Sequence, residues 1–252
     1  MSEGYDENRV EGSFEYIYVL PAGLCSSTVV DMSKWIIMLL NNGSYNGTEI
    51  LKPETVTLMQ KDHFVAHPYL PAVNLGLYEM DINNIHIIGH GGDTYYFHST
   101  MALFPELNFG FFISYNSHIG LYANSEFLPV FVSTFFPYTS ETIAPMEEYD
   151  KGLNDFTGHY ISSRRYYSEK TINYSDNYTR NIEMKDYFDI FSEIISVDGY
   201  LRFVGLDINF IQVEPDYFRE ASGDYDMSIA FIRDETGKVS YLYKLHSNYS
   251  DI

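Results

Sequence analysis

Residues Ile85 to Asn116 read IHIIGHGGDTYYFHSTMALFPELNFGFFISYN, and this stretch decides the fold. It holds three short apolar runs, Ile85–Ile88, Ser99–Phe104 and Phe109–Tyr115, which glycine, proline and asparagine separate. Runs of this length and composition, bounded by turn residues, are typical of β-strands. The last two runs are expected to form a hairpin around Pro105–Asn108. Because both sides of these strands are apolar, we expect cover on both faces of the sheet.

The tripeptide His90-Gly91-Gly92 follows the first run, at the expected end of that strand. Glycines at a strand end let another backbone or a ligand come close. A histidine there can donate a hydrogen bond or carry charge near neutral pH. Taken alone, the tripeptide is better explained as a turn that contains a histidine, so its interpretation depends on the flanking sequence.

The sequence upstream predicts two helices that pack on the sheet. Thr28 can cap the first helix, with Asp31 as its capping-box partner. Apolar residues then recur at helical spacing from Met32 to Leu40 and are expected to face the core. Asn41-Asn42-Gly43 ends this helix. A second short helix is predicted from Pro53 to about Gln60, because proline is favoured in a first helical turn.

Two more elements complete the first half of the chain. Leu75–Met80 is expected to begin the sheet, ahead of the three strands described above. Ser125–Phe136 is apolar and is predicted to be a helix laid back over the sheet. Pro129 falls early in that helix, where proline is tolerated.

Composition argues against several classes of partner. The formal net charge of −20 argues against binding to nucleic acid or to an anionic membrane surface, since both need a basic footprint. The single cysteine, Cys25, excludes an internal disulfide framework. No stretch reaches the length of a membrane span, and no signal peptide is visible. His63 and His67 lie in a proline-containing loop at a spacing that is no recognised ligand pattern, so we expect no metal there. We also expect no cofactor.

The second half of the chain has a different character. Pro137–Lys151 is rich in acids with little periodicity and is expected to be a linker between a domain at 1–136 and a domain at 152–252. Several short alternating segments at this spacing suggest a small antiparallel β-barrel or sandwich. Asp198-Gly199 and Glu235-Thr236-Gly237 are hairpin turn signals. The strand candidates are Phe156–Ser163, Tyr187–Ile195, Tyr200–Val204, Ile208–Val213, Tyr217–Glu220, Met227–Arg233 and Val239–Leu245.

An ordered set of short segments within residues 4 to 136, just over half of the chain, resembles a known superfamily. The segments are Gly4–Tyr5, Pro21–Leu24, Ser26–Trp35, Leu39–Gly43, Asn46–Gly47, Ile50–Thr55, Leu75–Leu77, Gly89–Gly92, Phe104–Glu106 and Asn116–Ser117. In that order they resemble the C-terminal half of the serine β-lactamases and penicillin-binding proteins. The branch that they resemble most contains class C β-lactamases, D,D-peptidases and esterases. The second half resembles a β-domain appended to some β-lactamase-like proteins.

This superfamily works with three motifs, of which the chain matches one. A Ser-x-x-Lys supplies the nucleophile and its basic partner, and a Tyr-x-Asn supplies a second acid/base group. His90-Gly91-Gly92 matches the third motif, which lines the far wall of the site. The sequence holds no Ser-x-x-Lys, and its Tyr-x-Asn, Tyr122-Ala123-Asn124, follows the third motif instead of preceding it. We interpret that tripeptide as a chance match.

The resemblance implies an α+β fold: a partial β-lactamase-like antiparallel sheet with covering helices, followed by the small β-domain. It implies a C-terminal fragment of a serine hydrolase acting on a β-lactam, a peptidoglycan peptide or an ester, inactive alone because the nucleophile is absent. His90 would bind a substrate carboxylate or join the proton relay. The backbone N–H of Asp93, just past Gly91 and Gly92, would be one oxyanion donor. The alternative is a non-catalytic binding or interaction module on the same scaffold.

Partners and location follow from the same resemblance. The full-length protein is expected to meet peptidoglycan or a small acyl substrate, in an extracytoplasmic or membrane-associated location. In the family, an N-terminal strand pairs beside the strand that matches Phe109–Tyr115. Without it, we expect an unpaired apolar edge and one uncovered sheet face, and hence a homo-oligomer through either. The alternative is that residues 1–20, or a strand of the second domain, cap the edge.

Overall fold

The computed structural model describes residues 2–17, 23, 25–137, 152–161, 191–204, 208–222 and 227–245. The chain divides into two compact units, and the described residues up to Pro137 belong to the first while those from Gly152 to Lys244 belong to the second. The expected linker lies outside the described residues except for Pro137, so the domain boundaries read from the sequence stay a prediction. Within the described ranges, no helix combines the length and the apolar character needed to cross a membrane.

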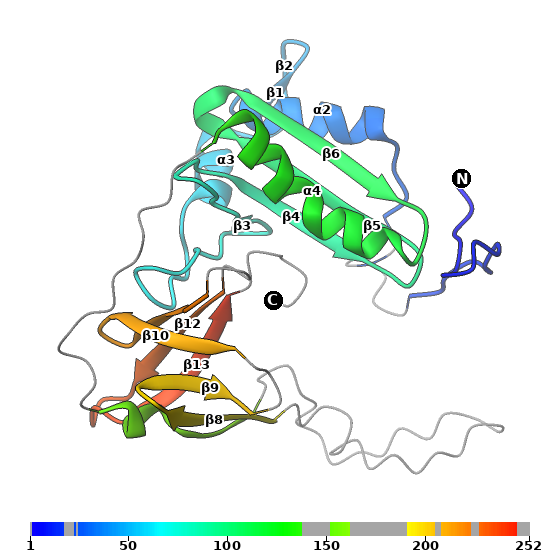
Figure 1. Ribbon diagram of the computed structural model, residues 1–252. Helices are drawn as coiled ribbons and strands as arrows, with labels where there is room; N and C mark the ends of the chain where they lie inside the picture. Colours follow the sequence, from blue (N-terminus) through cyan, green and yellow to red (C-terminus); the bar gives the residue numbers. More distant parts are fainter. Residues whose placement is uncertain are drawn as a thin grey trace, which may run out of the picture. The chain divides into compact units, whose positions relative to one another are not determined.

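The first unit is built on a four-stranded antiparallel sheet (Figure 1). Its strands, in spatial and chain order, are β3 (Tyr78–Glu79), β4 (Ile88–Asp93), β5 (His98–Phe104) and β6 (Phe109–Tyr115). The predicted hairpin of β5 and β6 is confirmed. Its chain reverses through a short 3-10 turn, Pro105–Leu107, and through Asn108 in the left-handed region, a conformation that asparagine tolerates.

Strand β4 differs from the prediction, which placed a strand at Ile85–Ile88 and a turn at the glycines. The strand begins where the prediction ended it, and every residue from Ile88 to Asp93 pairs with β5. A Cβ added to Gly89 would lie 2.1 Å from the carbonyl oxygen of Met101. This glycine therefore permits close approach of two strands and not a turn. The ladder with β5 outweighs the low strand propensity of glycine.

One face of the sheet is covered by the helices predicted upstream. Helix α2 (Val29–Leu40) begins after Thr28, whose hydroxyl oxygen accepts the N–H of Asp31 at 3.1 Å. Helix α3 is Pro53–Gln60. The chain that connects α2 to α3 forms a small hairpin of β1 (Ser44–Tyr45) and β2 (Thr48–Glu49). The core on this face includes Ile36, Leu39, Val56, Ile88, Met101 and Leu103.

The other face is covered by α4 (Gly120–Phe135), which in Figure 1 lies over β5 and β6 and runs along them. The helix starts five residues before the predicted Ser125, so Pro129 lies in its interior. The residue before the helix, Ile119, makes no side-chain cap, so the sequence gives no start signal there. The core on this face includes Met80, Ile87, Ala102, Phe104, Leu128 and Val132.

Both faces of the sheet therefore carry a helix, as the doubly apolar strands predict. The expectation that one face is uncovered is wrong, because α2 and α4 pack on opposite sides. At the ends of these elements the apolar residues are more exposed: Phe109 at the start of β6 is 39% exposed, and Phe135 at the end of α4 is 65% exposed.

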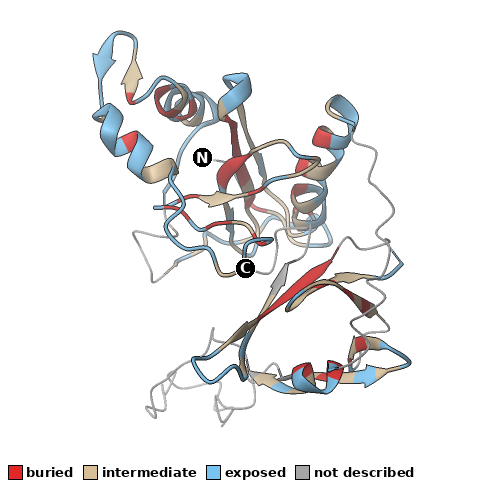
Figure 2. Ribbon diagram, turned by 90° about the vertical axis from the view of Figure 1, so that its left-hand side faces the viewer, coloured by how far each residue is buried: buried red, intermediate tan, exposed pale blue. Residues whose placement is uncertain are grey.

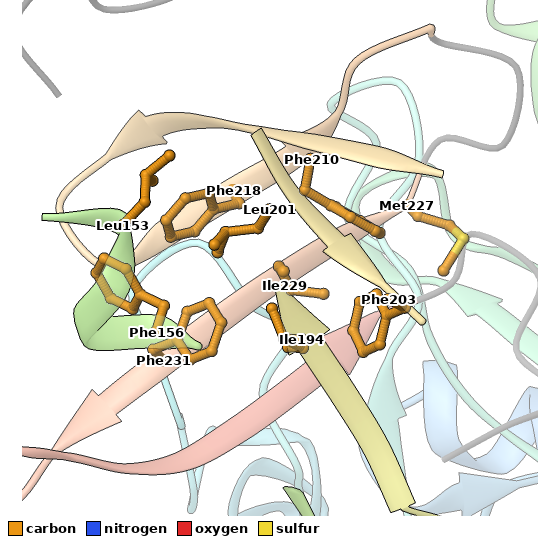
Figure 3. Packing of buried hydrophobic residues seen from close by; sticks show 10 residues of the cluster. All are labelled: Leu153, Phe156, Ile194, Leu201, Phe203, Phe210, Phe218, Met227, Ile229 and Phe231. Carbon is orange, nitrogen blue, oxygen red and sulfur yellow. The ribbon is translucent and has the colours of Figure 1, made fainter. Parts of the chain in front are cut away.

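The second unit is a single antiparallel sheet of seven described strands, in which each strand pairs with its neighbour in sequence. The sheet curves in a barrel-like way around one apolar core (Figures 2 and 3). Of the two architectures that the sequence predicted, a barrel and a sandwich, the structure therefore has the barrel-like one. Asp198 and Gly199 both have positive φ, 51° and 85°, as the predicted hairpin turn requires. The elements are η2 (Leu153–Phe156), β7 (Gly158–Ile161), β8 (Phe191–Val197), β9 (Tyr200–Phe203), β10 (Asn209–Glu214), β11 (Tyr217–Glu220), β12 (Ser228–Arg233) and β13 (Val239–Leu245).

Candidate functional site

The candidate site is the outer edge of β4, where the His90-Gly91-Gly92 motif lies. Strand β3 pairs with β4 only at Ile88 and Gly89. From His90 to Asp93, the side of β4 that faces away from β5 therefore has no strand neighbour among the described residues. The His90 side chain is exposed. The motif thus forms an accessible strand edge, not the turn that the sequence favoured.

Hydrogen bonding shows which backbone groups point outward at this edge. The N–H of Gly91 donates to the hydroxyl oxygen of Tyr78 at 2.7 Å, on the side away from β5. Alternate residues of an antiparallel strand direct their N–H and C=O groups to the same side. The N–H of Asp93 therefore also points to the outer edge. This is the group that the family resemblance assigns as an oxyanion donor.

The side chain of Tyr78 closes the inner end of this edge. Its ring lies 5.5 Å from the ring of His90, measured between centroids. Burial raises the pKa of the Tyr78 hydroxyl, and the charge of Asp93 raises it further, while the bond from Gly91 lowers it. The hydroxyl of Tyr78 is therefore neutral at physiological pH.

Space is open beside the two glycines of the motif to different degrees. A Cβ on Gly91 would lie 2.9 Å from the hydroxyl oxygen of Tyr78, whereas a Cβ on Gly92 would meet no atom within 4 Å. Among the described residues, the face of β4 is therefore open at Gly92 and closed by Tyr78 at Gly91.

The side chain of Asp93 is held by a histidine that the sequence analysis did not single out. Asp93 pairs directly with His98 across β4 and β5, and its Oδ1 lies 2.7 Å from Nδ1 of that histidine. His98 is 3% exposed, and its Nε2 has no hydrogen-bond partner among the described residues. The short contact assigns the Nδ1 proton to the bond with Asp93. The contact with a buried histidine holds the exposed carboxylate of Asp93 against β5.

The turn after β4 is closed by the N-terminal segment. Carboxylate oxygens of Glu15 accept from the hydroxyl of Thr94 at 2.6 Å and from the N–H of Tyr95 at 2.7 Å. A third, longer bond comes from the N–H of Tyr96 at 3.3 Å. One carboxylate thus organises the whole turn and holds the end of β4 in place.

No serine beside the motif, among the described residues, has the partner of an activated nucleophile. Ser99 pairs with Gly92 in register, but its hydroxyl bonds to the hydroxyl of Ser114 at 2.8 Å. Asn124 of the Tyr122-Ala123-Asn124 tripeptide is buried in α4 and accepts from the hydroxyl of Thr100 at 3.0 Å. That asparagine ties α4 to β5, which is a structural role.

The structure brings His90, Gly91, Gly92 and Asp93 together on one strand, but their roles in catalysis stay a prediction. Tyr78 and His98 join them through cross-strand register. The two loop histidines stand apart: a ring nitrogen of His63 lies 2.8 Å from the carbonyl oxygen of Leu58. The sequence alone does not point to Tyr78 or His98, because both approach the motif only through the pairing of β3, β4 and β5.

Comparison with known proteins yields a fold and no family. No protein-family profile and no curated protein matches the chain. Among solved structures, SurE has a TM-score of 0.55 at 13% identity, covering 97% of this chain and 55% of that one. SurE with D-Leu gives 0.45 at 14% identity, covering 79% and 43%. The octameric penicillin-binding protein homologue from Pyrococcus abyssi gives 0.38 at 18% identity, covering 87% and 47%.

These sequence identities and TM-scores limit the conclusion to the fold. The first SurE structure shows a shared fold alone, and the other two matches are distant likenesses on which nothing further rests. The chain spans about half of the length of the solved structures that it matches. The class reached is therefore a mixed α+β protein with a helix-covered antiparallel sheet and a barrel-like second sheet.

Proposed function

We propose that this chain provides the third-motif wall of a serine acyl-transfer hydrolase related to β-lactamases and penicillin-binding proteins. The observation that carries the proposal is the accessible outer edge of β4, with His90 exposed and Asp93 N–H directed outward. An extended acyl substrate fits such an edge as an added strand. The ordered sequence segments that include His90-Gly91-Gly92 support the same assignment.

In this proposal the residues of the edge have separate tasks. The N–H of Asp93 stabilises the oxyanion of a tetrahedral intermediate, with a second donor from the nucleophile's own backbone. His90 binds a substrate carboxylate or passes a proton. Its ring lies beside the Tyr78 ring. The Asp93–His98 contact holds the donor in position. The nucleophile and its base come from a Ser-x-x-Lys that this sequence does not contain.

The first experiment tests the chain as it stands. We expect no hydrolysis of a chromogenic cephalosporin or a short-chain nitrophenyl ester above background, because no acyl-enzyme forms without an activated nucleophile. Stoichiometric labelling by a fluorescent penicillin or a fluorophosphonate would contradict this and would identify another serine as the nucleophile.

The second experiment separates the hydrolase from a non-catalytic module on the same scaffold, the alternative that the missing Ser-x-x-Lys keeps open. The product of the complete coding sequence is incubated with fluorescent penicillin, with and without His90→Ala. A hydrolase is acylated at the serine of a Ser-x-x-Lys, and His90→Ala slows acylation by roughly 100-fold, as loss of a transition-state contact does. A coding sequence without that motif, whose product takes no label, supports the binding module.

The resemblance to this superfamily also supports proposals about cellular location, binding partners and oligomeric state. We propose an extracytoplasmic or membrane-associated location for the full-length protein, with peptidoglycan or a small acyl compound as its partner. We also propose a homo-oligomer, because β6 is the last strand of its sheet among the described residues.

A further inference from the structure

A second polar cluster lies on the ribbon that joins β3 to β4. Asn83 and Asn84 both have positive φ, 54° and 60°, which is the geometry of a type I′ turn. The turn sets Ile82 opposite Ile85, and the N–H of Met80 donates to the carbonyl oxygen of Ile87 at 2.8 Å. The chain from Met80 to Ile87 is thus a tight two-stranded ribbon.

This register sorts the side chains of the ribbon by face. Directly opposite residues of an antiparallel pair share a face, and the faces alternate along each strand. Apolar residues Met80, Ile82, Ile85 and Ile87 all lie on the α4 side, where they join the core. Glu79, Asp81 and His86 consequently share the other face. The sequence EMDINNIHII carries this alternation around an Asn-Asn pair, so the cluster can be read from sequence once the turn is recognised.

The ligand atoms of these three side chains converge. Nδ1 of His86 lies 3.2 Å from Oδ1 of Asp81 and 3.9 Å from Oε1 of Glu79. One ligand atom from each residue lies within 4.8 Å of the other two. The contact with Glu79 is too long for a hydrogen bond. Ligand atoms around a tetrahedral Zn²⁺, each about 2.0–2.2 Å from the metal, stand about 3.3–3.6 Å apart.

Backbone hydrogen bonds orient both carboxylates toward the histidine. The N–H of Ala72 donates to Oε2 of Glu79 at 2.7 Å, which leaves Oε1 on the His86 side. The N–H of Ile87 donates to Oδ1 of Asp81 at 2.8 Å, and Oδ2 of the same carboxylate lies 3.3 Å from Nδ1 of His86. Bonds of this kind fix ligand orientation in metal sites.

The cluster holds two carboxylates, and one of them has little access to solvent. The Glu79 side chain is only 18% exposed. Burial raises the pKa of Glu79, and the nearby charges of Asp81 and Asp62 raise it further, while the Ala72 bond and His86 lower it. Ionised Glu79 is thus disfavoured in the folded chain, and a cation placed between the carboxylates removes that cost.

We propose that Glu79, Asp81 and His86 form a binding site for a divalent transition-metal cation of the Zn²⁺ class. The neutral imidazole supplies nitrogen, the carboxylates supply oxygen, and water completes the coordination. The nitrogen ligand selects transition metals over Ca²⁺ and Mg²⁺, which prefer oxygen alone. Two carboxylates and one imidazole bring net charge −2, which one divalent ion balances.

The test is titration of the untagged full chain with ZnCl₂ by isothermal calorimetry, with Co²⁺ absorption as a report on coordination geometry. We expect one Zn²⁺ per chain at micromolar concentrations and no comparable signal with Ca²⁺. Glu79→Gln and His86→Gln should each weaken Zn²⁺ binding by roughly 100-fold, the upper end of losses at metal-site residues. Both variants retain polar side chains of similar size, and the amide oxygen that Glu79→Gln introduces can still accept from the N–H of Ala72.

The matched control is His159→Gln in the second unit. His159 also faces a carboxylate, with 4.0 Å between its Nε2 and Oε1 of Glu193, but that pair has no third ligand among the described residues. We expect His159→Gln to bind Zn²⁺ like the wild type. Absence of Zn²⁺ binding, or binding that Glu79→Gln and His86→Gln leave unchanged, overturns the proposal and leaves His86 as an ion-pair partner only.

A stability measurement distinguishes a metal ligand from a merely structural residue. Saturating Zn²⁺ should raise the melting temperature of the wild type above its value in EDTA and should leave that of Glu79→Gln nearly unchanged, because a ligand stabilises only the chain that binds it. A wild-type melting temperature that Zn²⁺ leaves unchanged contradicts the site.

Discussion

The two outer edges of the four-stranded sheet make a useful contrast. The outer edge of β4 carries glycines and polar side chains, and Tyr78 caps part of it. The outer edge of β6 is FGFFISY, with bulky apolar side chains that are mostly half-buried. A glycine edge leaves room for an extended ligand, whereas an apolar edge is a template for another chain. We therefore expect equivalent backbone groups to serve ligand recognition at β4 and chain association at β6.

The N-terminal segment reaches the β6 side but does not remove this contrast. Tyr5 donates its N–H to the carbonyl oxygen of Asn116 at 3.0 Å and accepts from the N–H of His118 at 2.8 Å. Both contacts lie just beyond the end of β6. Over Phe109–Tyr115 the outer edge has no strand partner among the described residues. The expectation that residues 1–20 cap the edge is thus met only past the strand itself.

The largest effect is expected for Ser114→Pro. Alternation from Gly91 through β5 directs the N–H of Ser114 to the outer edge of β6. If two chains pair along this edge, loss of that N–H and the proline ring should abolish pairing. Light scattering after gel filtration should give twice the chain mass for the wild type at tens of micromolar and one chain mass for the variant.

The control for that experiment is Ser114→Ala. It removes the hydroxyl contact with Ser99 but keeps the backbone N–H, so this variant should stay dimeric. A wild type that elutes as a monomer, or a Ser114→Pro variant that remains dimeric, shows that β6 is not the contact.

A second pair of variants sharpens the contrast within β4. Gly89→Ala places a methyl group 2.1 Å from the carbonyl oxygen of Met101 and should lower the free energy of unfolding by about 3 kcal/mol. Gly92→Ala meets nothing within 4 Å and should change it by less than about 0.5 kcal/mol. Urea unfolding of both variants measures the difference. Equal losses would mean that the face of β4 at Gly92 is not open.

The smallest effect concerns the cap on β4. Tyr78→Phe removes the acceptor of the Gly91 N–H and should lower the free energy of unfolding by about 1 kcal/mol. The pKa of Tyr78 is raised above its ordinary 10.0, so the hydroxyl contributes stability that is lost as pH rises through the folded pKa. The gap between wild type and variant should therefore shrink above about pH 10. A gap that is constant with pH would rule out Tyr78 as the titrating cap.

The sequence predicted the elements that carry their own local signals. Helix α2 begins after its capping residue Thr28, and α3 begins at Pro53. Strands β11 and β13 have the predicted bounds, because turn residues delimit them on both sides. Helix α4 was placed too late, since nothing in its first turn caps it.

The candidate site was harder to predict because it depends on pairing between strands. His90, Gly91, Gly92 and Asp93 were recognised as a motif, yet their strand was placed too early, since glycines also signal turns. Tyr78 reaches the motif only through the β3–β4 ribbon, and His98 only through the register of β5. Such contacts follow from register, which single-residue propensities do not specify.

Strand order also has a kinetic consequence in the first unit. Strands β3 to β6 pair in sequence order through short connections, so each hairpin closes at small entropic cost and can form early. The N-terminal segment docks differently, through contacts that are distant in sequence. The Asn116 side-chain amide donates to the carbonyl oxygen of Glu3, 113 residues away in sequence. During synthesis this segment waits for most of the unit to emerge. We therefore expect the N-terminal segment to be the last part of the unit to dock and the first to exchange its amide hydrogens.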